Sequence, residues 1–195
     1  MTQPTIIVIM GSTRAQRIGP DVARWVVELG EGATAATFEI IDLREWHLPM
    51  DDEPGIPAKD GYLQPHTKAW SDKVASADAI VFVTPQYNWG YPAPLKNAID
   101  HLYKEWVGKP AVIVTYGGHG GGKCAAQLQQ VLTGLKMRVV ETMPALQLSE
   151  EQVRGNSGII DAKTAFASHK PMVIGALVDL ASQLASPRAG SSPAI

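Results

Sequence analysis

Residues 81–102, VFVTPQYNWGYPAPLKNAIDHL, join the end of an apolar strand to a polar turn and the start of a helix. The strand is the uninterrupted apolar run 79–83, which ends at Thr84-Pro85. Such a run is typical of a strand that is covered on both faces. In a parallel α/β sheet, a strand-to-helix turn lies at the carboxyl edge, where ligands bind. This stretch therefore predicts a binding loop at the edge of a buried sheet.

The turn in this stretch is polar, aromatic and uncharged. It offers backbone N–H groups, the amide side chains of Gln86 and Asn88, and the ring faces of Tyr87 and Trp89. A phosphate-binding loop would be richer in glycine and in basic residues. We therefore expect this turn to contact a flat heteroaromatic ring.

A second candidate binding loop follows the first predicted strand, the β-branched run 5–10. It precedes a helix that starts at Pro20, and backbone N–H groups at a helix N-terminus favour an anion. Neither G-x-G-x-x-G nor a P-loop is present here, and two arginines favour a terminal phosphate. A helix cap with two solvated arginines is the alternative. Ser12 and Thr13 can donate hydroxyl hydrogen bonds to a phosphate, and Arg14 and Arg17 can donate charge-assisted ones.

A glycine-rich loop follows the fourth predicted strand, 111–116. Residues 117–123 fit the spacing G-x-x-x-x-G-K, but Cys124 stands where a P-loop needs Ser or Thr, which disfavours a nucleotide triphosphatase. The glycines instead let a backbone pass close to a ligand, where its N–H groups can bind a carbonyl or a developing negative charge. Because no supporting base accompanies Cys124, we expect it to be a packing residue.

The order of the elements predicts the fold. Strands are expected at 5–10, 37–42, 79–83, 111–116 and 138–143. Helices are expected from residue 20 and at 66–76, 94–103, 124–135 and 162–184, the last kinked or divided by Pro171. This alternation predicts an α/β flavodoxin-like three-layer sandwich with a five-stranded parallel sheet in order 2-1-3-4-5. The three loops follow strands that are adjacent in that order, so we expect them to meet in one crevice.

Composition narrows the class of protein. The 195 residues are 45% hydrophobic, which fits one domain at 1–184, followed by a Pro/Gly-rich tail at 185–195 that we expect to be disordered. A net charge of −2 with scattered basic residues gives no attraction to nucleic acid or anionic membrane. The single cysteine and an N-terminus without a signal-peptide or membrane-span pattern predict a cytoplasmic protein.

Two irregular segments, 43–65 and 146–158, interrupt this pattern. The first contains four prolines and the acidic run 51–53, which we expect to be solvated because nothing in the sequence brings further metal ligands to it. His101 lies in the predicted helix 94–103, and we expect it at the surface or at a subunit interface.

Three stretches together resemble the NADPH-dependent FMN reductase family, and within it the yeast-type NAD(P)H quinone/azo reductases. They are G-S-T-R-x-x-R-x-G, P-Q-Y-N-W-G-Y-P-x-x-L-K-N-A-I-D and the glycine-rich loop, and the resemblance spans roughly residues 5–145. It implies bound FMN, with the first stretch at the phosphate, the second along the isoalloxazine ring and the third at the pyrimidine end. The predicted cofactor-binding residues are Gly11, Ser12, Thr13, Arg14, Arg17, Gly19, Pro85, Gln86, Tyr87, Asn88, Trp89, Tyr116, Gly117 and Gly118.

The resemblance also implies a reaction. A ping-pong cycle would pass hydride from NADPH or NADH through FMN to a quinone, an azo compound, free flavin or a similar small-molecule acceptor, without a side-chain base or a metal. It implies a homodimer or a tetramer as well. Many members carry Glu where this chain has Gln86, so redox potentials and substrate preferences do not transfer. A flavodoxin-like electron carrier and a flavin redox sensor remain alternatives.

Overall fold

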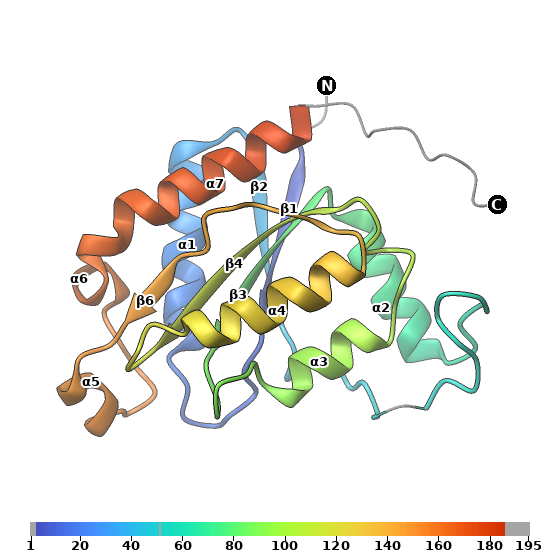
Figure 1. Cartoon of the computed structure of the whole chain (residues 1–195), viewed down its shortest axis with the longest axis horizontal. Helices are drawn as coiled ribbons and strands as arrows, with labels where there is room; N and C mark the ends of the chain where they lie inside the picture. The colour runs from blue at the N-terminus through green and yellow to red at the C-terminus, as the bar shows by residue number, and fades with distance from the viewer. Residues whose placement is uncertain (1–2, 51, 186–195) are drawn as a thin grey trace.

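A parallel sheet in the order β2-β1-β3-β4-β5 forms the centre of the molecule (Figure 1). The computed structural model describes residues 3–50 and 52–185. The pairs β1–β2, β1–β3, β3–β4 and β4–β5 are all parallel, so the order predicted from the sequence is confirmed. The strands are β1 (Thr5–Met10), β2 (Thr37–Asp42), β3 (Ala79–Pro85), β4 (Pro110–Gly117), β5 (Arg138–Val139) and β6 (Ala145–Gln147).

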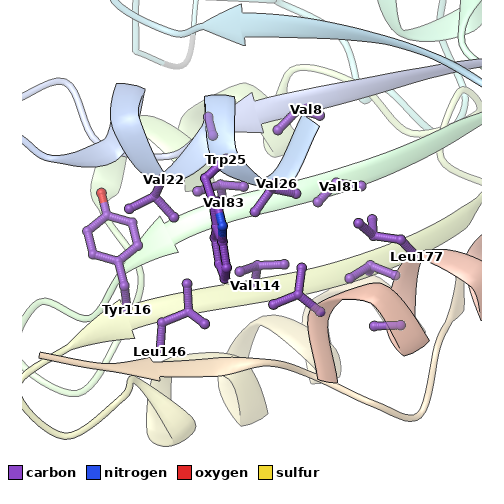
Figure 2. Packing of buried hydrophobic residues seen from close by; sticks show 14 of the residues in the cluster. Val8, Val22, Trp25, Val26, Val81, Val83, Val114, Tyr116, Leu146 and Leu177 are labelled. Carbon is purple, nitrogen blue, oxygen red and sulfur yellow. The ribbon is translucent and has the colours of Figure 1, made fainter. Parts of the chain in front are cut away.

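The three central strands are buried because helices cover both faces of the sheet. The helices are α1 (Gly19–Ala33), α2 (Pro65–Ser76), α3 (Ala93–Asp100), α4 (Gly122–Gly134), α5 (Glu150–Arg154), α6 (Ala162–Ala165) and α7 (Lys170–Ala185), with a 3-10 turn at Ala167–His169. Alternate residues of β1, β3 and β4 pack against α1 and α7 on one face, where Trp25 and Leu177 lie (Figure 2). The other alternate residues pack against α2, α3 and α4.

The edge of the sheet differs from the single fifth strand expected at 138–143. The structure forms β5 over two residues and resumes pairing with β4 in β6. Ala111 pairs with Val139 and Thr115 pairs with Ala145, so six steps along the edge chain match four along β4. Pro144 lies in this bulge, and proline lacks the N–H that a continuous ladder needs. The expected strand is therefore confirmed over 138–139 and wrong over 140–143.

The C-terminal part is also more divided than the sequence suggests. The expected helix 162–184 is split into α6, the 3-10 turn and α7, and Pro171 lies in the first turn of α7, where proline is tolerated. Segment 146–158, expected to be irregular, contains the end of β6 and helix α5. Helix α7 continues through Ala185, and the rest of the expected tail lies outside the described residues. Within the described ranges, no helix combines the length and apolar character needed to cross a membrane.

Candidate functional site

The loops that follow β1, β3 and β4 meet at the carboxyl edge of the sheet around a cavity of about 380 Å³. This volume falls within the range of small-molecule sites, about 300–1,000 Å³. Eight of the fourteen residues predicted from the sequence line the cavity. They are Arg14, Arg17, Pro85, Gln86, Tyr87, Tyr116, Gly117 and Gly118.

The buried side chain of Arg17 stabilises the loop after β1. Its side chain is 6% exposed, its Nη1 donates to the Ser12 carbonyl at 2.9 Å, and its Nη2 pairs with the Asp42 carboxylate. Parallel pairing places Asp42 opposite Met10, next to the start of the loop, which explains why a β2 residue reaches this arginine. The buried Nε of Arg17 has no hydrogen-bond partner among the described residues.

Tyr87 joins the loop after β3 to the loop after β1. Its hydroxyl shares a hydrogen bond with Ser12 Oγ at 2.7 Å, and the Arg14 guanidinium carbon lies 3.6 Å from the centre of its ring. Ser12 is 1% exposed and lies beneath the cavity rather than on its wall. The structure therefore places Ser12 as a support for Tyr87 and Arg14 as a cation at the mouth of the site.

The turn after β3 has a left-handed backbone at two residues that are not glycine. Tyr87 and Gly90 exchange backbone hydrogen bonds, and the residues between them, Asn88 and Trp89, have φ values of 47° and 72°. Positive φ at both central positions is the pattern of a type I′ turn and is costly for a side chain as large as tryptophan. Trp89 stays 63% exposed, and the Lys123 ammonium lies 2.8 Å from its ring centre. Backbone strain of this kind gathers at binding sites.

The loop after β4 contacts the same cavity through backbone and is tied to the β3 turn. The Cys124 N–H, at the start of α4, donates to Gln86 Oε1 at 3.1 Å. Gly121 has φ 95°, and a Cβ there would lie 2.7 Å from the Thr115 Cβ, so only glycine fits. Gly117 and Gly118 bring peptide groups to the cavity wall with no side chain in front of them.

Six predicted residues do not line the cavity: Gly11, Ser12, Thr13, Gly19, Asn88 and Trp89. Gly11 permits the close approach of the loop to β3, since a Cβ there would lie 2.6 Å from Thr84 Oγ1. Gly19 lies under the Tyr116 hydroxyl, which would be 3.0 Å from its Cβ. These positions shape the site from behind or from its rim.

One wall of the cavity comes from a segment for which the sequence predicts only irregular structure and no site residues. Segment 148–160 closes one side of the cavity with Leu148, Gln152, Val153, Gly155, Asn156, Ile159 and Ile160. The signal in the sequence is the pattern Ser149-x-x-Gln152, a capping box that the structure forms at the start of α5. Gln16 and Ile18 complete the lining from the loop after β1.

The electrostatic character of the cavity is positive at one end and neutral elsewhere. Arg14 and Arg17 are the charged residues of its described lining, which contains no carboxylate. Burial raises the pKa of Tyr116 well above its ordinary value, so the phenol stays neutral at the physiological range of pH. An anion at the arginines and an uncharged flat group along Tyr87 and Gln86 would both be complementary to this arrangement.

Cys124 gives a direct test of whether the glycine-rich loop carries a reactive thiol. Its side chain is buried, and burial raises the pKa of the Cys124 thiol to about 12. Because the thiolate is the reactive form, we expect folded protein at about pH 8 to resist alkylation that proceeds readily in denaturant. Intact-mass measurement after reaction with iodoacetamide checks this. Equal labelling rates in the folded and unfolded protein would contradict the structural role.

The contact between Tyr87 and Ser12 predicts a modest effect on cofactor binding. Tyr87→Phe removes one hydrogen bond but keeps the ring under Arg14, so we expect the affinity for FMN, the cofactor that the sequence resemblance implies, to fall about five- to tenfold, the equivalent of roughly 1 kcal/mol. Fluorescence titration of apoprotein with FMN measures the change. Tyr91→Phe is the matched control, because Tyr91 follows the same turn but packs against the α2/α3/α4 side of the core. Equal FMN affinities for the two variants would contradict a role of the Tyr87 hydroxyl in cofactor binding.

The fold and the edge site define a class: a flavodoxin-like α/β protein in which a loop with two arginines and a turn with aromatic and amide side chains line one cavity. Residues 4–150 match the family model described as NADPH-dependent FMN reductase. The chain belongs to the NADPH-dependent FMN reductase family.

Individual relatives agree with this assignment. An NAD(P)H-dependent FMN reductase of Schizosaccharomyces pombe is 55% identical over 168 residues, which cover 85% of this chain and 83% of the relative. A quinone reductase of Escherichia coli K12 is 31% identical over 143 residues, 69% of this chain and 72% of the relative. Among solved structures, FerB, a flavoenzyme NAD(P)H:(acceptor) oxidoreductase from Paracoccus denitrificans, matches with a TM-score of 0.71 and 22% identity, covering 92% of this chain and 98% of that one.

Proposed function

We propose that this protein is an FMN-dependent NAD(P)H oxidoreductase that reduces a quinone or a similar small acceptor. The observation that carries the proposal is the convergence of Arg14, Arg17, Tyr87, Gln86 and Gly118 on one cavity. These residues offer cations at one end, an aromatic and amide wall in the middle and bare peptide groups at the other end. The names of the relatives, an FMN reductase and a quinone reductase, support the same donor and acceptor classes.

The residues present fit FMN. The buried Nε of Arg17 has no partner among the described residues, which suits an arginine that receives an anionic ligand. Arg14 and Arg17 would hold the phosphate, Gln86 and Tyr87 would lie along the ring system, and Gly117 and Gly118 would face its pyrimidine edge. Bound FMN supplies acceptance of hydride from NAD(P)H and its donation to the acceptor.

The protein's own part in this chemistry is to bind, orient and polarise. The arginines fix one end of the ligand by charge, and the Ser12–Tyr87 hydrogen bond fixes the turn that lies along it. Peptide N–H groups at Gly117 and Gly118 would stabilise negative charge that develops near them, without any proton transfer from a side chain. Tyr116 remains a neutral phenol because burial raises its pKa, so it supplies packing and no base.

A flavodoxin-like electron carrier and a flavin redox sensor are the alternatives to a reductase. An archaeal flavodoxin structure matches with a TM-score of 0.58, which shows that the fold does not decide between them. A carrier that docks protein partners by charge needs a strong field, whereas this chain has a net charge of −2. The arginine pair and the family membership favour the reductase.

The test is the visible absorbance of freshly purified protein before and after anaerobic addition of NADPH or NADH. We expect a bound-flavin spectrum that bleaches, returns with added benzoquinone, and supports steady NAD(P)H consumption when quinone is in excess. A flavin spectrum that neither nucleotide changes would favour the carrier or the sensor. A colourless protein that FMN cannot reconstitute would contradict the cofactor itself.

Two further properties complete the proposal. We infer a homodimer or tetramer from the family resemblance and a cytoplasmic location from the single, buried, unpaired cysteine. Light scattering coupled to gel filtration measures the first, and a monomer at micromolar concentration would contradict it. Fractionation of cells that produce the protein measures the second.

A further inference from the structure

A cluster of potential metal ligands lies apart from the FMN cavity, on the face of the sheet covered by α2 and α3. Asp52 comes from the loop between β2 and α2, His66 from the first turn of α2, and His101 from the residue that caps α3. One ligand atom from each lies within 4.8 Å of the other two. None of the three lines the cavity that holds Arg14 and Tyr87.

The structure corrects two expectations at this point. His101, expected at the surface or at an interface, is buried within the chain and only 5% exposed. Asp52, expected to be solvated in an acidic run, is partly buried and faces two histidines, while Asp51 lies outside the described residues. The convergence of ligands that the sequence did not show is therefore present.

His101 is oriented as a metal-binding histidine is. Its Nδ1 lies 2.8 Å from the Asn97 carbonyl oxygen of the preceding helical turn, so Nδ1 carries the proton and donates it there. In the neutral ring, Nε2 then presents a lone pair. That Nε2 is buried, has no hydrogen-bond partner among the described residues, and lies 3.6 Å from Asp52 Oδ1. Metal-ligating histidines almost always donate the other ring N–H to a carbonyl or carboxylate in this way.

His66 and Asp52 supply the other two ligands. His66 Nε2 lies 3.0 Å from Asp52 Oδ1 and 2.9 Å from Oδ2, and the two histidine rings meet edge to face with centroids 6.1 Å apart. A tetrahedral ion with bonds of about 2.0–2.1 Å separates its ligand atoms by about 3.3 Å. The separations of the two histidine nitrogens from Asp52 bracket this value, and the ligand atoms of His66 and His101 lie within 4.8 Å of each other, so side-chain rotations would close the site.

We propose that Asp52, His66 and His101 form a binding site for a divalent transition metal, with Zn²⁺ the ion that best suits two imidazoles and one carboxylate. A fourth position would open to the cavity of about 390 Å³ that Asp52 and His101 line. Because the three ligands come from a loop and two helices, the ion would fasten the segment 43–64 to α2 and α3. The role is structural, and it is independent of the FMN site.

The neighbouring charges leave Asp52 available for this role. Glu53, next in the chain, is already engaged: its carboxylate accepts the N–H groups of Leu63 and Gln64, both at 2.9 Å. Lys96, which lines the same cavity, is paired with Asp100. Among the described residues, the ion-pair partners of Asp52 are the two histidines of the cluster.

The test uses tag-free, full-length, FMN-loaded protein that has been treated with a chelator and exchanged into metal-free buffer. Zn²⁺ is titrated in competition with a chromophoric zinc indicator, and Co²⁺ is added separately because its visible spectrum reports tetrahedral N/O ligands. We expect one equivalent of Zn²⁺ to bind and to raise the melting temperature, since the metal binds only the folded state. Asp52→Asn, His66→Gln and His101→Gln should each weaken binding by at least about tenfold.

His47→Gln is the matched control, because His47 is an exposed histidine of the same loop outside the cluster. It should bind Zn²⁺ like the unaltered protein. Asp52→Asn keeps the assay decisive if His101→Gln does not fold, since Asp52 is only partly buried and the amide has the same shape. Absence of one-equivalent binding, or equal affinity of the unaltered, Asp52→Asn and His66→Gln proteins, would overturn the proposal and leave a His–Asp hydrogen bond only.

Discussion

Replacing Arg17 with alanine is expected to lower the free energy of unfolding by about 2–4 kcal/mol and to yield protein poor in FMN. The guanidinium is nearly buried and has two partners, the Ser12 carbonyl and the Asp42 carboxylate, both of which lose a charged donor. The substitution therefore removes the contacts that hold the loop after β1 in place, and it also removes one of the two arginines that would bind the phosphate. Urea denaturation of the apoprotein and the flavin-to-protein absorbance ratio measure the two effects separately.

Arg14→Ala is the matched control for this prediction. Arg14 is exposed and stacks on the Tyr87 ring, so its loss should change stability by roughly 1 kcal/mol or less while still reducing FMN affinity. From the sequence alone, both arginines are expected to act only on the phosphate. The structure separates them into a cation at the mouth and a support within. Equal stability losses for the two variants would contradict that separation.

Replacing Trp70 with alanine is expected to cost about 3–5 kcal/mol of stability, the range for deleting a large buried aromatic side chain. Trp70 is fully buried in α2, its indole N–H donates to the Ala98 carbonyl of α3 at 2.8 Å, and its ring lies 4.9 Å from that of Trp46. It therefore anchors α2, α3 and the start of the long loop together. Chemical denaturation followed by circular dichroism measures the loss.

Trp70→Phe separates packing from hydrogen bonding at this position. It keeps most of the buried ring and loses the indole N–H, so the cost should be nearer 1–2 kcal/mol because the Ala98 carbonyl loses its partner. A loss for Trp70→Phe as large as that for Trp70→Ala would show that the hydrogen bond, and not the buried volume, holds α2 to α3.

The central sheet is predictable because its signal is local. The runs 5–10, 79–83 and 111–116 are apolar without interruption, and parallel strands between two helix layers require that pattern. The edge strand is less predictable because an edge position tolerates a bulge. The six residue steps from Val139 to Ala145 pair with only four steps along β4, and this difference depends on contacts with β4 that the edge sequence does not show.

The site is predictable at the level of loops and less so at the level of side chains. Strand order alone brings the three loops to one edge. Which atoms meet is a matter of tertiary distance: Ser12 and Tyr87 are 75 positions apart, and no pattern in either loop shows that their hydroxyls bond to each other. The same holds for Arg17 and Asp42, which meet because β1 and β2 are in register.

The burial of His101 is not predictable from its polar side chain or from its place in the helix. The apolar face of α3 is Leu95, Ala98 and Ile99, and a histidine at the end of that helix has the character of a surface residue. It is buried because residues 43–64, which have no helical or strand periodicity, fold over it. Loops of this kind carry their packing information in contacts with other elements, not in their own sequence pattern.

The hydrogen bonds between Tyr87 and Ser12 and between Cys124 and Gln86 join the three loops that surround the cavity to one another. Loops that are tied to each other have less conformational entropy to lose when a ligand binds. FMN uptake by apoprotein should therefore follow a single bimolecular phase in stopped-flow fluorescence, with no slower ordering step behind it. The same two hydrogen bonds would hold the walls of the cavity together while the cofactor leaves and binds again.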